Sequence, residues 1–240
     1  MSPSFSERTP ARTDSVPRVR ISHPALLRNA QRLVDGLPRG SRVVDLRDDA
    51  LGHGALGCAA TLARAGVETA IVDESASLAM PDAAPGGLRI VTSGRATIDA
   101  ATLFGLADLS APVMRLAGTV LGVKPLRAGE GVSYGYAHRA THDTRVALVT
   151  GGYAQGVVRS LGGRARVRVA GGTHPIVGRV AMDVCVVDIA DAAAGRGDEV
   201  VFFGDPEAGE PAVREWAELT GLTVGEIVTA VGARVRREDA

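Results

Sequence analysis

Lysine is almost absent from this sequence. Lys124 is the only lysine, and every other residue among the 27 basic ones is an arginine. An arginine stays protonated at physiological pH, whereas a lysine amine can lose its proton, attack a carbonyl group and act as a base. Any mechanism that needs a side-chain amine therefore has a single candidate residue.

Other absences narrow the class of protein. The 27 acidic residues balance the 27 basic ones, so charge gives no reason to expect binding to nucleic acid or to an anionic membrane. Cys58 and Cys185 are far apart and form neither a disulfide framework nor a zinc pattern, so we expect two core residues and no metal site. No apolar run reaches about 20 residues, and the first residues lack the apolar stretch of a secretory signal. We expect a cytoplasmic protein with a disordered tail over residues 1–17.

The pattern over residues 18–110 predicts alternating strands and helices. We expect helices at 24–37, 54–66 and 74–80 and strands at 41–46, 69–74 and 87–93. The apolar stripe of the first helix recurs at helical spacing, and Pro24 suits a first turn. Such alternation is typical of right-handed βαβ units and a parallel sheet.

Residues 111–240 have a different pattern. Short β-type runs follow one another, separated by glycine-rich turns, and two helices are expected near the end, at 211–220 and about 224–232. This pattern predicts a mostly antiparallel barrel-like or sandwich domain.

Four phrases in this second half carry a family resemblance: GEGVSYG (129–135), GGYAQGVVR (151–159), PIVGRVAMD (175–183) and GDEVVFFG (197–204). Together they resemble the C-terminal domain of alanine racemases, which use pyridoxal phosphate (PLP). The resemblance implies an α+β two-domain fold. Its N-terminal part would be a partial α/β layer, similar to a truncated TIM barrel, and its C-terminal part the racemase-like β-barrel domain.

The stretch VVDLRDDALGHGA (43–55) resembles the racemase segment in which a barrel strand ends in the lysine that binds PLP. Aligned on Gly52, His53 and Gly54, that lysine falls on Arg47, and the family's aromatic residue falls on Leu51. An arginine does not form the imine with PLP. Lys124 lies in a stretch that resembles the linker before a racemase tyrosine, not at a strand end. We therefore expect that PLP binding has been lost.

The length supports the same expectation. A (β/α)8 barrel takes roughly 250 residues, and only about 110 precede the β domain here. Residues 97–105 resemble the family's last barrel strand and phosphate loop, but Ile98 and Ala100 replace its arginine and glycine. Gly225 stands where a racemase tyrosine contacts the phosphate. The middle of the barrel looks deleted.

The resemblance also implies what is kept. Tyr134 matches the second catalytic base, which in the family serves the partner's cofactor across a dimer interface. Met182 matches a residue that helps bind the substrate carboxylate, also from the partner. Tyr153 matches a gate tyrosine, in a phrase where Gln155 replaces an acid. These residues predict a homodimer, or a heteromer with a full-length racemase.

Each candidate residue also has a plainer interpretation. Arg47 lies among Asp45, Asp48 and Asp49, which favours a solvated ion-pair cluster over an anion site. His53 is either structural or an acid–base group. Tyr134 is either a residue that still faces a pocket or interface, or one retained for packing. His138 and His142 lie in a predicted loop, and we do not expect them to bind metal.

Three functions stay open from sequence. The first is a racemase-like protein without PLP that acts as a binding, regulatory or partner protein, with a small amino acid or an anion as ligand. The second is altered amino-acid chemistry around Tyr134, Tyr153 and His53. The third is an authentic alanine racemase that interconverts L- and D-alanine. Whether the protein is an enzyme is not decided by the sequence.

Overall fold

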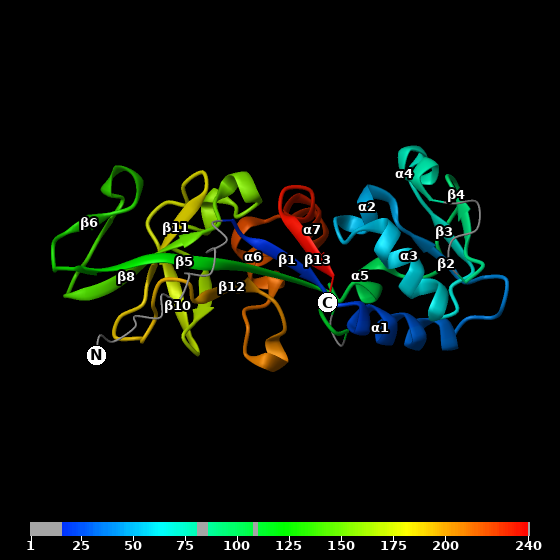
Figure 1. Ribbon diagram of the computed structural model, residues 1–240, viewed down its shortest axis with the longest axis horizontal. Coiled ribbons are helices and arrows are strands. Elements are labelled where there is room, and N and C mark those ends of the chain that lie inside the picture. The colour runs from blue at the N-terminus through cyan, green and yellow to red at the C-terminus, as the bar shows by residue number, and fades with distance from the viewer. Residues whose placement is uncertain (1–15, 81–85, 108–109, 240) are drawn as a thin grey trace, which may run out of the picture.

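The structure is a computed structural model that describes residues 16–80, 86–107 and 110–239. A β barrel and a smaller α/β layer lie end to end along its long axis, and strands β1 and β13 with helices α6 and α7 lie between them (Figure 1). Nearly all of the predicted tail, residues 1–17, falls outside the described residues. None of the helices in the described ranges combines the length and apolar character that a bilayer-spanning helix needs.

The α/β layer contains a three-stranded parallel sheet in the order β2 (Val43–Asp45), β3 (Thr69–Ile71), β4 (Arg89–Val91). Its helices are α1 (His23–Asp35), α3 (Ala55–Arg64) and α4 (Glu74–Ala79). Helix α1 begins where Ser22 caps it, because the Ser22 hydroxyl accepts the N–H of Ala25 at 3.3 Å. The three strands predicted in this half are confirmed, as is their parallel pairing.

The free edge of β2 is bonded by residues 97 and 98. The backbone N–H groups of Thr97 and Ile98 both donate to the carbonyl of Val43, at 2.9 and 3.0 Å. The Val43 N–H also donates to the Thr97 hydroxyl at 3.1 Å, and helix α5 (Ala100–Leu103) follows directly, so the segment that resembles a last barrel strand is bonded to β2 and continues as a short helix. Residues 92–96 therefore cross from the β4 edge to the β2 edge, and Gly94 lies against the Ile71 side chain.

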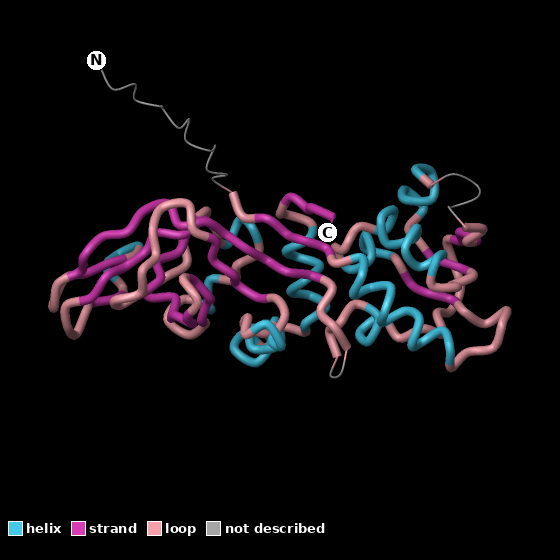
Figure 2. The backbone as a smooth tube through the Cα atoms, turned by 60° about the horizontal axis from the view of Figure 1, so that its bottom comes forward, coloured by secondary structure: helices cyan, strands magenta, loops and turns pink. Residues whose placement is uncertain are grey.

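The second region is a closed antiparallel barrel (Figures 1 and 2). Around the ring its strands are β5 (Met114–Leu126), β8 (Thr144–Thr150), β11 (Val184–Asp188), β10 (Gly172–Val177), β9 (Arg166–Val169) and β12 (Glu199–Phe203). The ring closes because β12 pairs with β5. The predicted antiparallel barrel is thus confirmed. A hairpin of β6 (Gly131–Val132) and β7 (His138–Arg139) projects from it.

Two helices cover the barrel near the α/β layer, α6 (Val213–Thr220) and α7 (Val224–Gly232). Trp216 of α6 is fully buried and packs edge-on against Phe203 and Phe202, with ring centroids 5.2 and 6.3 Å apart. Aromatic pairs in this geometry are favourable beyond the area that they bury. These contacts fix α6 on β12.

Strand β1 (Arg18–Ile21) corrects the domain boundary predicted from sequence. The prediction placed residues 18–110 in the α/β layer, but β1 pairs antiparallel with β5 and parallel with β13 (Arg236–Asp239). The chain therefore starts its described part in the sheet of the second region, and enters the α/β layer only at α1.

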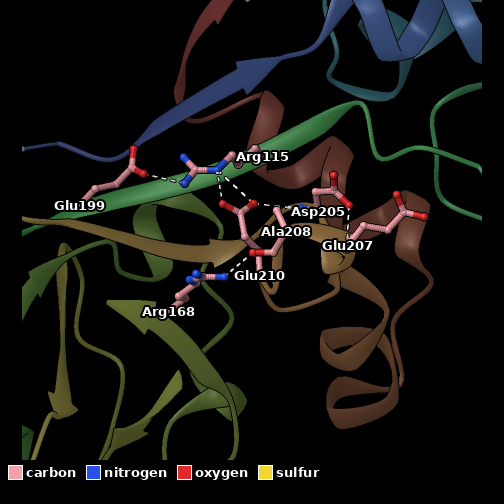
Figure 3. A network of polar contacts seen from close by, with 7 residues as sticks. All are labelled: Arg115, Arg168, Glu199, Asp205, Glu207, Ala208 and Glu210. Atoms are coloured by element: carbon pink, nitrogen blue, oxygen red, sulfur yellow. Dashed lines mark hydrogen bonds and ion pairs between the residues drawn. The ribbon is translucent and has the colours of Figure 1, made fainter. Parts of the chain in front are cut away.

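A polar network ties the loop after β12 to the barrel (Figure 3). Arg115 of β5 donates to Glu199 at 2.6 Å and to Glu210 at 2.9 Å. Arg168 donates to the carbonyl of Ala208, in the short helix η4 (Pro206–Ala208). Because Glu210 is mostly buried, with 13% of its side chain exposed, its charge depends on Arg115.

Candidate functional site

The chain leaves β2 through a left-handed turn, α2 (Arg47–Leu51). Four successive residues, Asp48 to Leu51, have φ angles of 53°, 54°, 57° and 51°. This conformation costs L-residues roughly 1–2 kcal/mol each. A strained backbone persists only where surrounding contacts over-determine it, and such sites gather at functional positions.

The contacts that hold this turn come from the end of the chain. Arg237 of β13 donates to the Asp49 carboxylate and to the carbonyl of Gly52, and the other Asp49 oxygen accepts the N–H of Ala55 at 2.8 Å. Helix α7 packs so closely that a Cβ atom on Gly232 would lie 2.1 Å from the Gly52 oxygen. The turn is therefore held by hydrogen bonds from Arg237 and by the close packing of Gly232 against Gly52.

Arg47 forms an ion pair with Asp45. Its Nε donates to Asp45 Oδ1 at 2.9 Å, and a second guanidinium nitrogen bonds the other carboxylate oxygen. The hydrogen bonds from Arg47 hold the pKa of Asp45 below its ordinary value. This geometry agrees with the ion-pair interpretation of Arg47.

A pocket of about 370 Å³ opens beside this pair, at the carboxyl ends of β2 and β3. It is lined by Asp45, Arg47, Asp48, Leu51, Asp73 and Ala100. Three carboxylates against one guanidinium give the pocket a negative charge, which disfavours an anion. Sequence analysis did not identify Asp73 as a site residue. Its place just after β3, which corresponds to that of Asp45 at the end of β2, could have identified it.

His53 is buried away from this pocket, with 2% of its surface exposed. Its ring stacks on Phe104 with centroids 4.4 Å apart, and Nδ1 lies 2.9 Å from the carbonyl of Ala50, which assigns the proton to Nδ1. Nε2 has no partner among the described residues. Burial lowers the pKa of His53 to about 4. This placement argues against the acid–base role considered for His53.

In the segment that resembles the phosphate loop, backbone N–H groups are hydrogen-bonded to other groups of the protein. The Asp99 carboxylate caps α5, accepting the N–H and the hydroxyl of Thr102 at 2.8 and 2.7 Å. The N–H groups of Thr97 and Ile98 are bonded to β2. Gly225, in the first turn of α7, offers no hydroxyl. In this segment the Asp99 carboxylate therefore lies at the start of α5, where the unpaired N–H groups of a helix favour a negative charge.

Tyr134 begins the short helix η1 (Tyr134–Tyr136) on the barrel, and 73% of it is exposed. Ser133 before it has φ 69° and ψ 174°, a region that is essentially restricted to glycine. The Ser133 hydroxyl accepts the N–H of Arg179 at 3.2 Å. A strained residue therefore fixes the backbone that turns Tyr134 to the surface.

Tyr153 and Met182 lie together on another part of the barrel. Tyr153 opens η2 (Tyr153–Gln155), whose N–H groups at Tyr153 and Ala154 donate to the carbonyls of Ala181 and Met182, both at 3.0 Å. Met182 is 55% exposed and Tyr153 is 38% exposed, with Arg159 over the tyrosine ring at 5.3 Å. Both side chains are open to a partner or ligand.

One chain does not bring Tyr134 near Arg47. The β6 hairpin, which leads into Tyr134, lies at the far end of the barrel, whereas α2, which begins at Arg47, lies in the α/β layer beyond β1 and α7 (Figure 1).

The closed antiparallel barrel beside an α/β layer defines an alanine racemase-like fold. The family described as alanine racemase, C-terminal domain, matches residues 113–239. Alanine racemase of Mycobacterium ulcerans is 42% identical over 168 residues, which cover 69% of this chain and 42% of that protein. For alanine racemase of Thermobifida fusca the identity is 41% over 169 residues, 70% of this chain and 44% of that protein. The chain belongs to the alanine racemase family.

Solved structures agree on the fold. Alanine racemase from Streptomyces coelicolor matches with a TM-score of 0.83 at 22% identity, over 95% of this chain and 99% of that chain. Alanine racemase from Bartonella henselae, solved with covalently bound pyridoxal phosphate, matches with a TM-score of 0.75 at 16% identity, over 94% of this chain and 99% of that chain. In sequence, however, the chain spans less than half the length of the curated relatives that it matches.

Proposed function

We propose that this chain is a member of the alanine racemase family that does not racemise alanine with PLP, and that it acts as a binding or partner protein through the barrel surface around Tyr134. The observation that carries the proposal is Arg47. It stands at the end of β2, where the family resemblance expects the PLP lysine, and its guanidinium is bonded to Asp45.

Three further features support the loss of PLP. The pocket beside Arg47 is negatively charged, the segment at 97–105 is capped by Asp99, and Gly225 replaces a phosphate-binding tyrosine of the resemblance. Lys124 lies on β5 opposite Val146, in the barrel region rather than at an α/β strand end. The three-stranded sheet is, in this proposal, what remains of a TIM barrel whose middle has been deleted.

The proposed partner is a second copy of this chain or a full-length racemase. Tyr134, Met182 and Tyr153 are exposed on the barrel, as residues offered to another chain must be. Light scattering should give twice the chain mass of 24.7 kDa for a homodimer. A monomer that also captures no racemase from its native cell contradicts both versions. A cytoplasmic location stays a prediction from sequence.

The cofactor proposal is tested by adding PLP to the purified chain. We expect no visible absorbance of a lysine-bound cofactor, no borohydride-trapped adduct on Lys124, and no conversion of L- to D-alanine. Arg47→Lys should add an amine without restoring turnover, because the phosphate contacts are also missing. A matched Arg64→Lys variant controls for a non-specific adduct.

Family membership supports one alternative, an authentic alanine racemase. Wild-type turnover that depends on PLP would favour it and refute the proposal. Turnover without PLP that is lost in Tyr134→Phe would instead favour altered chemistry around Tyr134.

A further inference from the structure

A pocket of about 490 Å³ lies where the α/β layer meets the second region. It is lined by α1, by residues that link α5 to β5, by the loop that forms η4, and by the start of α6. A cavity of this volume is roughly 10 Å across, within the range of small-molecule sites. It shares no residue with the pocket beside Arg47 and includes none of Tyr134, Tyr153 and Met182, so it depends neither on the loss of PLP nor on the proposed partner surface.

Hydrogen bonds hold both sides of this pocket in place. Asn29 of α1, with 3% of its surface exposed, donates to the carbonyls of Leu103 and Ala111 at 3.1 and 2.8 Å. The Asn29 carbonyl accepts the N–H of Ala111 at 3.2 Å, so the link between α5 and β5 is fastened to α1. On the other side, the N–H of Gly204 donates to the carbonyl of Pro211 at 2.9 Å and closes the loop that forms η4. The pocket is therefore formed before a ligand arrives, which lowers the cost of binding.

Charges of both signs line the pocket without pairing to each other. Arg28 and Arg32 lie one turn apart on α1, whereas Asp205 and Glu207 lie at the start of η4 and within it. Neither of these arginines forms a hydrogen bond or ion pair with the described residues. Arg214, which also lines the pocket, already has an interaction partner. The Glu207 carboxylate forms no hydrogen bond or ion pair with the described residues either, as Figure 3 shows. The pocket therefore offers unpaired cations on one side and an unpaired anion on the other.

We infer that this pocket binds a zwitterionic dipeptide, with its carboxylate on Arg28 and Arg32 and its ammonium group on Glu207. Arginine binds a carboxylate through strong, charge-assisted hydrogen bonds. The two charges of an extended dipeptide lie about 6 Å apart, against about 2.5 Å in a single amino acid, so only the longer ligand reaches both sides of the pocket. Its side chains lie on the apolar part of the lining, where burial is favourable: Leu106, Ala111, Pro112, Pro206 and Val213.

Calorimetry with glycylleucine as the probe tests this site, and three related compounds each lack one feature of it. N-acetylglycylleucine lacks the ammonium group, glycylleucine amide lacks the carboxylate, and free leucine carries its two charges too close together. We expect one saturable site for glycylleucine, with each of the other compounds at least about tenfold weaker because a charge-assisted bond is lost. No saturable binding of glycylleucine, or equal binding of any of the three, overturns the proposal.

Variants place the two ends of the ligand. Arg28→Met with Arg32→Met should weaken glycylleucine binding about tenfold or more and abolish its advantage over the amide. Glu207→Gln should instead narrow its advantage over the acetylated form. Arg64→Met, which removes an exposed cation from α3, should leave the affinity unchanged. All four positions are exposed, so we expect these variants to fold. Binding that survives the double arginine variant, or that is lost in Arg64→Met, overturns the assignment.

Discussion

Acidification should destabilise the fold through His53. In an unfolded chain a histidine titrates near 6.5, whereas burial lowers the pKa of His53 to about 4 in the folded state. Between these values the unfolded state binds a proton that the folded state excludes. The contribution to stability is therefore complete above about pH 6.5 and is lost as pH falls towards 4.

The difference between the two pKa values sets the size of the effect. At about 1.4 kcal/mol for each tenfold change in proton affinity, the full difference corresponds to about 3 kcal/mol. Most of it, about 2 kcal/mol, should be lost between pH 7 and pH 4.5. Carboxylates such as Asp45, whose pKa is lowered in the fold, also weaken the protein in acid, so a reference variant is needed.

His53→Asn supplies that reference, because its amide keeps a donor near the Nδ1 position and does not titrate. Urea unfolding at pH 7 and pH 4.5 should show a loss of stability about 2 kcal/mol larger in wild type than in the variant. Equal losses would refute the assignment of a neutral, buried His53. If the variant does not fold, NMR titration of the His53 ring in wild type gives the same answer, since its signals should not shift between pH 8 and pH 5.5.

Three more predictions concern packing and charge. Gly232→Ala would force α7 from the left-handed turn and should cost about 1–3 kcal/mol in urea unfolding, whereas Gly195→Ala, with open space around its Cβ, should cost far less. Arg115→Met leaves a mostly buried glutamate unpaired and should cost about 2 kcal/mol at pH 7; a neutral result would contradict the network in Figure 3. Burial raises the pKa of Cys58 and of Cys185 to about 12, so a thiol reagent at pH 8 should label neither until the chain is unfolded.

The sequence predicted the elements that have a strong hydrophobic period. Helices α1, α3, α6 and α7 carry apolar residues at helical spacing and lie close to their predicted places, and the short β-type runs predicted after residue 110 form the six barrel strands. Strand β13 was missed because Arg236–Asp239 is a run of four charged residues. It forms through backbone pairing with β1, which no local pattern reveals.

The site was predictable only in part, for a similar reason. The ion pair of Arg47 with Asp45 is local and was expected. The burial of His53 depends on Phe104, which is distant in sequence, and the left-handed turn depends on Arg237 and Gly232 at the other end of the chain. The chirality of L-residues favours right-handed backbone conformations throughout RDDAL, and tertiary contacts override that preference.

The charged composition of β13 has a consequence for how copies of this protein meet. In the described residues β13 is the outermost strand of the eight-stranded sheet, so one row of its backbone groups faces outward and can template another strand. Four successive charged side chains make such an addition unfavourable, because pairing with another strand would remove water from them. Apolar residues at Arg236 and Glu238 would remove this protection and turn a terminated sheet into one that grows by edge-to-edge stacking, visible as soluble aggregates of rising size.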